Sequence, residues 1–272
     1  MNTDLDSWIT AKASNRVVER LRKGLPVTAF GVRISRTPDI ARLAKASGHD
    51  VIWVDLEHSS IPIDAAVQIC ATAMDIGMTP FVRVPERDYG VIGRLLDGGA
   101  AGIMAPRIET PEQAADIVAA SRFPSQGHRS AIGTLPYVEY RKVPPAQLYD
   151  VVNRSVAVKV LIESPLGIAN IEAIASVPGV DFIGIGTNDL SAELGVPGEY
   201  RHPKVRAAHE AALAGCLKVG KPLAIGGIPD LAYGAELVRM GAAPFLMTAI
   251  DTDLLLTAAT ERVQRALDSI NR

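Results

Sequence analysis

The sequence alternates between short apolar runs and longer amphipathic stretches, and this alternation limits the folds that are open to it. Runs that are predominantly apolar and only four to seven residues long are typical of strands buried on both faces, as in parallel sheets. The stretches between them, such as 63–74, repeat apolar residues at helical spacing. Eight apolar runs occur: 27–32, 51–54, 79–84, 100–105, 156–162, 180–185, 222–225 and 244–249.

Eight strand–helix units in 272 residues predict an α/β protein, a single (β/α)8 barrel over residues 1–272 with an N-terminal and a C-terminal helix. An open doubly wound sheet usually has a glycine-rich turn after its first strand. The nearest match here, GIG at 184–186, belongs to the sixth run. The long segment 121–147 is typical of a lid or an interface element, and His128 is its candidate lid residue.

Composition excludes several classes of partner. The formal net charge is −2 and aromatic residues make up 5% of the chain, which argues against a nucleic-acid surface. No apolar run approaches the roughly 18 residues that a membrane span needs, and the N-terminus lacks the apolar core of a signal peptide. Cys70 and Cys216 lie in separate helix-like segments and are expected to be buried free thiols. We therefore expect a cytoplasmic protein that binds neither nucleic acid nor membrane.

Polar residues appear abruptly where the second apolar run ends. Val54 is followed by Asp55, Glu57 and His58, although ionisable groups are costly to bury. In a (β/α)8 barrel the carboxyl ends of the strands form the active-site face, where such groups meet solvent and ligand. The sequence therefore predicts that these three residues lie at the mouth of the barrel.

Three further runs end in residues that suit the same chemistry. Arg83 lies near the end of the third run, Glu163 follows the fifth, and Asp189 follows the sixth. Two carboxylates suit a hard divalent ion such as Mg²⁺ or Mn²⁺, and an arginine binds a carboxylate through its planar fork. A histidine beside carboxylates, here His58, can serve as a base near neutral pH. Together they are the parts of a site that forms and stabilises an enolate.

Each of these residues also has an ordinary structural explanation. Asp189 could be the N-cap of a helix, and Arg83 could pair with Glu86 or Asp88 on the surface. His58 alone would more often be structural than catalytic. Their convergence on one face of one predicted fold favours the functional interpretation.

At this point the sequence resembles a known family. VDLEHSS (54–60), FVRVPERD (81–88), IGRLLDGGA (92–100), VLIESPLG (160–167) and GIGTNDLSAELG (184–195) together resemble the HpcH/HpaI family of metal-dependent pyruvate aldolases. The resemblance covers nearly the whole chain. It implies a lyase with a (β/α)8 fold that acts on pyruvate or another 2-oxo acid and an aldehyde, with oxaloacetate decarboxylation as a side activity. It also implies a homo-oligomer, a hexamer built as a dimer of trimers, with the last helix packed on a neighbour.

The resemblance also implies roles for individual residues. His58 matches the catalytic base, and Asp97 matches a carboxylate that strengthens it. Arg83 matches the arginine that binds pyruvate, and the two ligands of a Mg²⁺, Mn²⁺ or Co²⁺ ion are matched by Glu163 and Asp189. The substrate-binding segment corresponds to Gly186, Thr187 and Asn188, and two supporting acids correspond to Asp55 and Glu57.

Two departures from the family pattern concern the substrate. Leu161 stands where family members often have a glutamine that contacts substrate, and TAIDTD (248–253) replaces a Gly-Ser-Asp near the eighth strand. Two alternative functions remain open. One is an acyl-CoA lyase of the citrate lyase β type, although His58 replaces the last acid of that pattern. The other is a catalytically silent barrel that acts as a binding protein, which the presence of all the site residues argues against.

Overall fold

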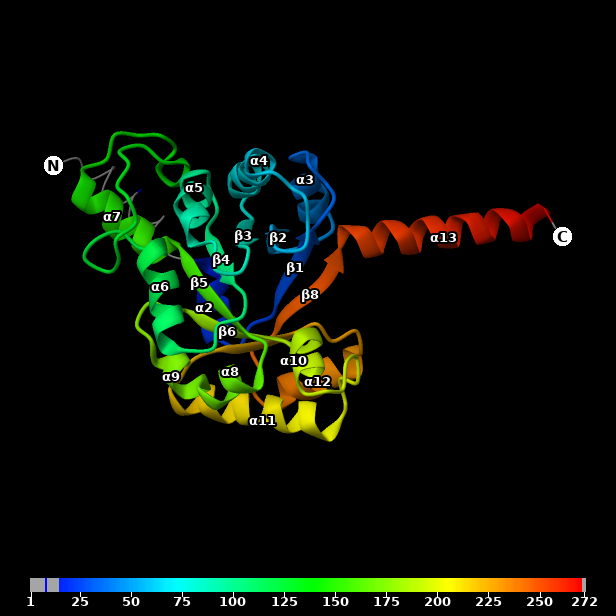
Figure 1. Cartoon of the computed structure of the whole chain (residues 1–272). Coiled ribbons are helices and arrows are strands. Elements are labelled where there is room, and N and C mark those ends of the chain that lie inside the picture. The colour runs from blue at the N-terminus through cyan, green and yellow to red at the C-terminus, as the bar shows by residue number, and fades with distance from the viewer. Residues whose placement is uncertain (1–7, 9–14, 271–272) are drawn as a thin grey trace.

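The computed structural model describes residue 8 and residues 15–270, in which eight parallel strands alternate with helices (Figure 1). Each strand lies within two residues of its expected bounds, which confirms the strand predictions. The strands are β1 Val27–Val32, β2 Val51–Asp55, β3 Thr79–Arg83, β4 Gly102–Ala105, β5 Ala157–Ile162, β6 Phe182–Gly186, β7 Leu223–Gly226 and β8 Phe245–Ile250.

The strands form a nearly closed barrel, which confirms the predicted fold class. Their order is β7-β6-β5-β4-β3-β2-β1-β8, and all neighbours in this order are parallel. A backbone hydrogen bond of 2.7 Å from the Ala243 N–H to the Leu223 carbonyl joins the two end strands near their starts.

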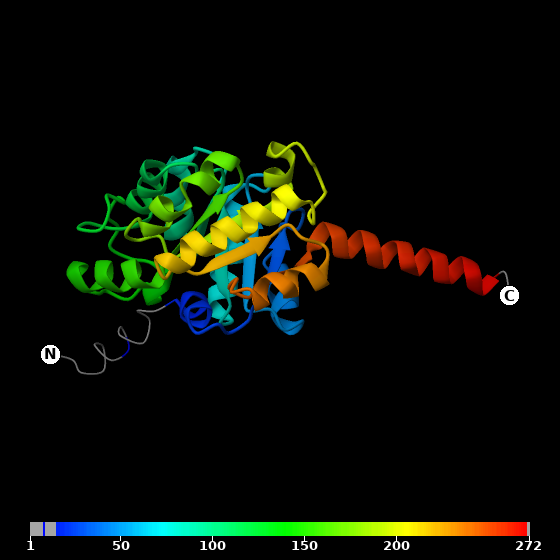
Figure 2. The same ribbon diagram turned by 90° about the horizontal axis from the view of Figure 1, so that it is seen from below.

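Most of the helices cover the outside of the sheet, and Figure 2 shows α11 (yellow) running along that outside. The α-helices are α2 Arg16–Arg22, α3 Asp39–Ala46, α4 Ile63–Asp75, α5 Ile92–Asp97, α6 Pro111–Ser121, α7 Pro145–Ser155, α8 Pro165–Ala169, α9 Ile171–Ser176, α10 Thr187–Glu193, α11 Pro203–Lys218, α12 Leu231–Arg239 and α13 Asp251–Ile270; the 3₁₀ turns are η1 Tyr89–Val91 and η2 Pro136–Val138. Cys70 and Cys216 are buried free thiols, as expected. Within the described part of the chain, no helix combines the length and the apolar character that a bilayer crossing requires.

The interior of the barrel is filled by large side chains that alternate with glycines. Phe81, Phe182 and Phe245 contact one another there, and the apolar face of α2 packs against the same cluster. Any side chain at Gly102 would collide with Phe81, since an added Cβ would lie 2.2 Å from that ring. This close packing fills the lower part of the barrel interior.

The segment 121–147 lies at the end of the barrel where the strands begin, because it leads from the end of α6 to α7, which precedes β5. The Arg122 guanidinium donates to the Val156 carbonyl at 2.7 Å and to Asp181 at 2.8 Å, and both acceptors directly precede strands. The Tyr137 hydroxyl donates to the Ala100 carbonyl, which precedes β4. The lid interpretation, with His128 as its residue, is therefore wrong for this chain: the segment covers the face opposite the strand ends that carry the site.

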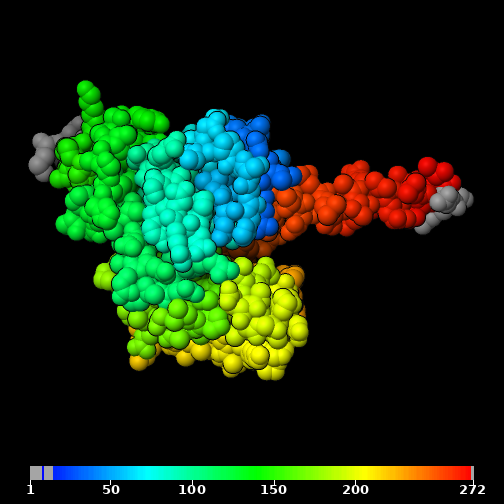
Figure 3. Space-filling model, viewed as in Figure 1, coloured from blue at the N-terminus to red at the C-terminus, as the bar shows by residue number. Residues whose placement is uncertain are grey.

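Helix α13 projects away from the body of the protein (Figures 1 and 3). Apart from Asp251 at its start, no residue of its described part is buried. Its exposed apolar side chains are Leu254, Leu255, Leu256, Val263, Leu267 and Ile270.

Candidate active site

A cavity of about 120 Å³ opens at the carboxyl ends of the strands. Residues from strands on opposite sides of the barrel line it, so a small ligand would contact both walls. The predicted residues among its lining are Arg83, Glu163, Gly186, Asn188 and Asp189.

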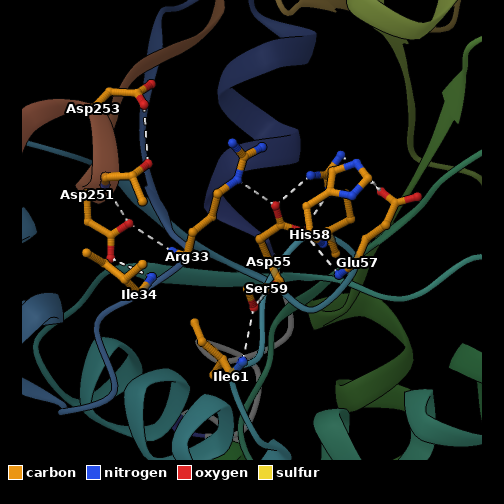
Figure 4. A network of polar contacts seen from close by, with 11 residues as sticks. Arg33, Ile34, Asp55, Glu57, His58, Ser59, Ile61, Asp251 and Asp253 are labelled. Carbon is orange, nitrogen blue, oxygen red and sulfur yellow. Dashed lines mark hydrogen bonds and ion pairs between the residues drawn. The ribbon is translucent and has the colours of Figure 1, made fainter. Parts of the chain in front are cut away.

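Asp55 is the centre of a charged network beside this cavity. Its carboxylate is fully buried and accepts hydrogen bonds from Arg83 at 2.9 and 2.6 Å and from the Arg33 Nε at 2.8 Å. The backbone N–H groups of Glu57 and His58 also donate to it (Figure 4). Burial alone would raise the pKa of Asp55, but the bonds from Arg83 and Arg33 outweigh it, so that its pKa is lowered.

Arg83 has inward partners and is not a surface ion pair. Its Nε and Nη2 are bound to Asp55, and its Nη1 lies 3.0 Å from the Glu57 carboxylate. Glu86, the alternative partner, pairs with Arg87 at 3.2 Å. A guanidinium has five N–H groups, so two N–H groups of Arg83 remain for a ligand in the cavity.

Glu163 lies on the far wall of the cavity, where the packing leaves room for its side chain. It is buried, and one oxygen accepts a 2.9 Å hydrogen bond from the Arg107 backbone N–H. A Cβ on Gly186 would lie 2.3 Å from the other oxygen, so only glycine fits there. Burial raises the pKa of Glu163 to about 7, with a further contribution from the charge of Asp189.

Asp189 faces the same space from the first turn of α10. The N-cap of that helix is Gly186, so the simple capping explanation for Asp189 does not hold. Its closest cation is the Arg107 guanidinium, 3.9 Å away. Among the described residues, no group of three or more His, Cys, Asp or Glu side chains has an arrangement that could hold a metal ion by itself. Glu163 and Asp189, two carboxylates that repel one another, fit a divalent cation that keeps other positions for water or ligand.

His58 lies at the rim of the site, half exposed, with its Nε2 3.7 Å from the Glu57 carboxylate. Asp97 does not lie beside it. Asp97 ends α5, near the end of the barrel where β4 begins, and accepts a 2.6 Å hydrogen bond from Arg129. The His58–Asp97 pair that the resemblance implies is therefore not formed within a single chain. The carboxylate next to the His58 imidazole is that of Glu57.

The two polar residues that precede Asp189 differ in what they can offer a ligand. Thr187 is fully buried, and its hydroxyl lies 3.2 Å from the Nε2 of His209, so only its backbone is available. Asn188 is exposed, and its side-chain oxygen accepts a 2.8 Å hydrogen bond from the Tyr200 hydroxyl.

Lys159 and Arg33 also line the cavity. The sequence reasoning named Lys159 only as the lysine to test for imine chemistry if the enzyme needs no metal, and it did not name Arg33. Lys159 is buried on β5, with its ammonium 4.3 Å from the Phe245 ring centre and 5.4 Å from that of Phe182. Burial lowers its pKa to about 7, and the charge of Arg83 adds to this. The sequence contained a signal for Lys159, because Lys159 on β5 and Glu163 directly after β5 are four residues apart, and the two-residue period of an extended chain places them on the same face.

We expect Lys159→Met to raise the melting temperature by several degrees at pH 6 and by less at pH 9. The amine titrates near about 10.4 in an unfolded chain and near 7 in the folded protein. The cost of burying its charge is therefore complete below pH 7 and declines as the pH rises toward 10. Calorimetry at both values tests this, with the exposed Lys142→Met as control. An equal rise in melting temperature at pH 6 and pH 9 would contradict the lowered pKa of Lys159.

Comparison with known proteins gives relatives that cover most of the chain. It is 34% identical to the 4-hydroxy-4-methyl-2-oxoglutarate aldolase of Hapsidospora irregularis over 91% of this chain and 93% of that protein. It is 35% identical to the hydroxypyruvate/pyruvate aldolase of Sagittula stellata over 82% and 87%. Both relatives are carbon–carbon lyases by name.

Solved structures share the fold. The crystal structure of the HpcH/HpaI aldolase from Desulfitobacterium hafniense superposes with a TM-score of 0.86 and 27% identity, over 93% of this chain and 97% of that one. The citrate lyase beta subunit of M. tuberculosis, complexed with oxaloacetate and magnesium, has the same fold at 19% identity and a TM-score of 0.54, over 85% of this chain and 92% of that one.

The match to a family model agrees with these relatives. The model of HpcH/HpaI aldolase/citrate lyase matches residues 34–258, which include all the cavity residues except Arg33. The resemblance drawn from the motifs is thus confirmed, and so is the prediction of an enzyme of the lyase class. This chain belongs to the HpcH/HpaI aldolase/citrate lyase family.

Proposed function

We propose that the chain is a metal-dependent pyruvate aldolase that forms and cleaves 4-hydroxy-2-oxo acids. The observation that carries the proposal is that Glu163 and Asp189 face Arg83 across one cavity at the carboxyl ends of the strands. The names of the relatives support it, since they are aldolases of 2-oxo acids. Oxaloacetate decarboxylation is proposed as a side activity because it would produce the same pyruvate enolate.

Glu163 and Asp189 are the proposed ligands of the metal, which could be Mg²⁺, Mn²⁺ or Co²⁺. Burial is the main cause of the raised pKa of Glu163 and repulsion from Asp189 adds to it; a divalent cation between the two carboxylates would relieve both. When bound, such an ion supplies a Lewis acid for the carbonyl of a 2-oxo acid. Oxygen-rich sites with few protein ligands discriminate poorly among these three ions, so the native metal is not part of the proposal.

Arg83 and the backbone of the segment 186–188 are the proposed binding groups for the 2-oxo acid. The two free N–H groups of Arg83 would donate to its carboxylate and to the enolate oxygen as negative charge develops there. Asp55 holds the guanidinium in place by two hydrogen bonds, so Arg83 is oriented before the substrate arrives.

His58 is the proposed base that removes a proton from the methyl group of pyruvate, directly or through a water molecule. Its half-exposed position at the rim leaves the imidazole accessible from the cavity mouth. Glu57, 3.7 Å from the imidazole, is the carboxylate that would stabilise the protonated form within one chain. The resemblance implies that Asp97 strengthens this base. That role is also a proposal, because Asp97 pairs with Arg129 in this chain.

A homo-oligomer is also proposed, in agreement with the resemblance to hexamers. The projecting helix α13 supports this, because it exposes six large apolar side chains along most of its length.

Incubation with pyruvate, Mg²⁺ and a panel of aldehydes tests the proposed function, with the 4-hydroxy-2-oxo acid products detected by mass spectrometry. We expect products with several aldehydes and pyruvate release from the reverse reaction. Cleavage of CoA thioesters without aldol products would instead favour the citrate lyase β alternative. A protein that binds pyruvate but does not exchange its methyl protons would be a silent barrel.

A further inference from the structure

Arg33 has a position in the cavity that the reaction proposed above does not use. It follows β1 directly, so its side chain starts at the mouth of the barrel, four strands away from Glu163 in the sheet order. Its Nε donates to Asp55 at 2.8 Å, and the side chain is 31% exposed. Among the described residues, no hydrogen bond to the Nη1 or Nη2 of Arg33 is found. The outer edge of this guanidinium is therefore open to the cavity.

Arg33 is held in this position from two sides. Asp251, which is almost fully buried, accepts hydrogen bonds from the backbone N–H groups of Arg33 at 2.9 Å and Ile34 at 3.1 Å (Figure 4). The backbone N–H group of Ser35 also donates to it, at 2.9 Å. These bonds tie the loop after β1 to the start of α13, while Asp55 orients the guanidinium. A cation fixed in this way loses little entropy when an anion binds to it.

The N–H groups that Arg33 leaves unused are those that suit a carboxylate. Asp55 accepts only from the Nε of Arg33, because the same carboxylate already has a two-point contact with Arg83. Arg83 is shared between Asp55 and Glu57, so that the two arginines together balance these two acids. The two N–H₂ groups of Arg33 remain at the β1 side of the cavity, in the planar arrangement that binds a carboxylate.

We propose that Arg33 binds a carboxylate on the acceptor half of the aldol substrate, so that the preferred acceptors are oxo acids and the products are 4-hydroxy-2-oxo dicarboxylic acids. This inference rests on the proposed aldolase function and adds the substrate class to it. In the synthetic direction the methyl carbon of pyruvate loses a proton and forms a bond to the acceptor carbonyl carbon. The former carbonyl oxygen gains a proton and becomes the 4-hydroxyl group. The second carboxylate takes no part in bond formation and serves only for binding.

Glyoxylate and glycolaldehyde are the probes for this proposal, because they are aldehydes of similar size and only glyoxylate has a carboxylate. For Arg33→Gln we expect the ratio of kcat/KM for glyoxylate to that for glycolaldehyde to fall by about 10–100-fold, the usual value of a hydrogen-bonded charged group. For Arg33→Lys, which keeps the positive charge but not the planar guanidinium, this ratio should fall by less. The matched control is Arg36→Gln. Arg36 lies in the same loop and donates to Ser60, away from the cavity, so the ratio should stay unchanged.

Equal losses for both acceptors in Arg33→Gln would overturn the proposal, because they would show that Arg33 acts only through Asp55 and Arg83. If Arg33→Gln does not fold, the same ratio in Arg33→Lys decides, since an unchanged ratio there also rejects carboxylate binding through the planar fork. Proton exchange at the methyl group of pyruvate, measured without an acceptor, tests the aldolase function separately. Wild-type protein that exchanges protons but prefers neither acceptor would refute only the role of Arg33; wild-type protein that does not exchange would refute the function itself.

Discussion

Glu163→Gln should reduce aldol turnover by roughly 10³-fold or more, because it removes one of only two proposed ligands of a metal that contributes several kcal/mol. In the wild-type protein, a chelator should abolish activity reversibly, and Mg²⁺, Mn²⁺ or Co²⁺ should restore it. Titration with Mn²⁺ followed by calorimetry measures the binding directly, independently of turnover. Full activity of protein freed of metal would refute metal dependence and direct attention to imine chemistry at Lys159.

The stability of this variant separates loss of metal from loss of structure. Burial raises the pKa of Glu163 to about 7 in the folded protein, against about 4.3 in an unfolded chain. A raised pKa stabilises the folded state below pH 4, and this contribution is lost as the pH rises toward 7. Glu163→Gln should therefore melt at a higher temperature than the metal-free wild type at pH 8, and not at pH 4. The control is Glu193→Gln, since Glu193 also pairs with Arg107 but is half exposed and is not a proposed ligand.

His58→Ala should slow proton exchange at the pyruvate methyl group by about 10²–10⁴-fold, the usual contribution of a positioned acid–base group. Exchange followed by NMR in deuterated water measures this step without an aldehyde. His128→Ala is the matched control, because His128 is exposed in the segment at the other end of the barrel. Unchanged exchange in His58→Ala would remove the imidazole from the mechanism.

Two further variants identify the carboxylate that assists His58. Glu57→Gln should slow exchange by less than His58→Ala does, because the imidazole remains but loses its neighbour at 3.7 Å. Asp97→Asn should leave exchange unchanged if the protein acts as one chain, since Asp97 contacts Arg129. A slower exchange in Asp97→Asn without a change in melting temperature would mean that this carboxylate reaches His58 from another copy of the chain.

The sequence alone was sufficient to predict the barrel, because the signals are local. A strand buried on both faces must be apolar throughout, as in Val51–Val54, and a helix on the outside must repeat its apolar residues at 3.6-residue spacing. The end of each strand was equally visible, since the first ionisable residue after an apolar run, such as Glu163, marks the solvent-facing mouth. The order of the strands then followed from the barrel itself, in which consecutive strand–helix units lie side by side.

The tertiary structure decided which residues the side chains at the mouth contact. Sequence spacing could not show that Arg83 uses most of its fork on Asp55, because that contact depends on the register Asp55–Arg83 between β2 and β3. It also could not show that Asp97 lies far down the barrel, because a motif gives positions along the chain and not the direction in which a helix returns. Arg33 directly follows the first apolar run, but the sequence could not show that it is fixed beside the cavity, since that depends on Asp251, which is 218 residues away. Local periodicity determines elements, whereas contacts between distant elements determine which charges remain free to bind a substrate.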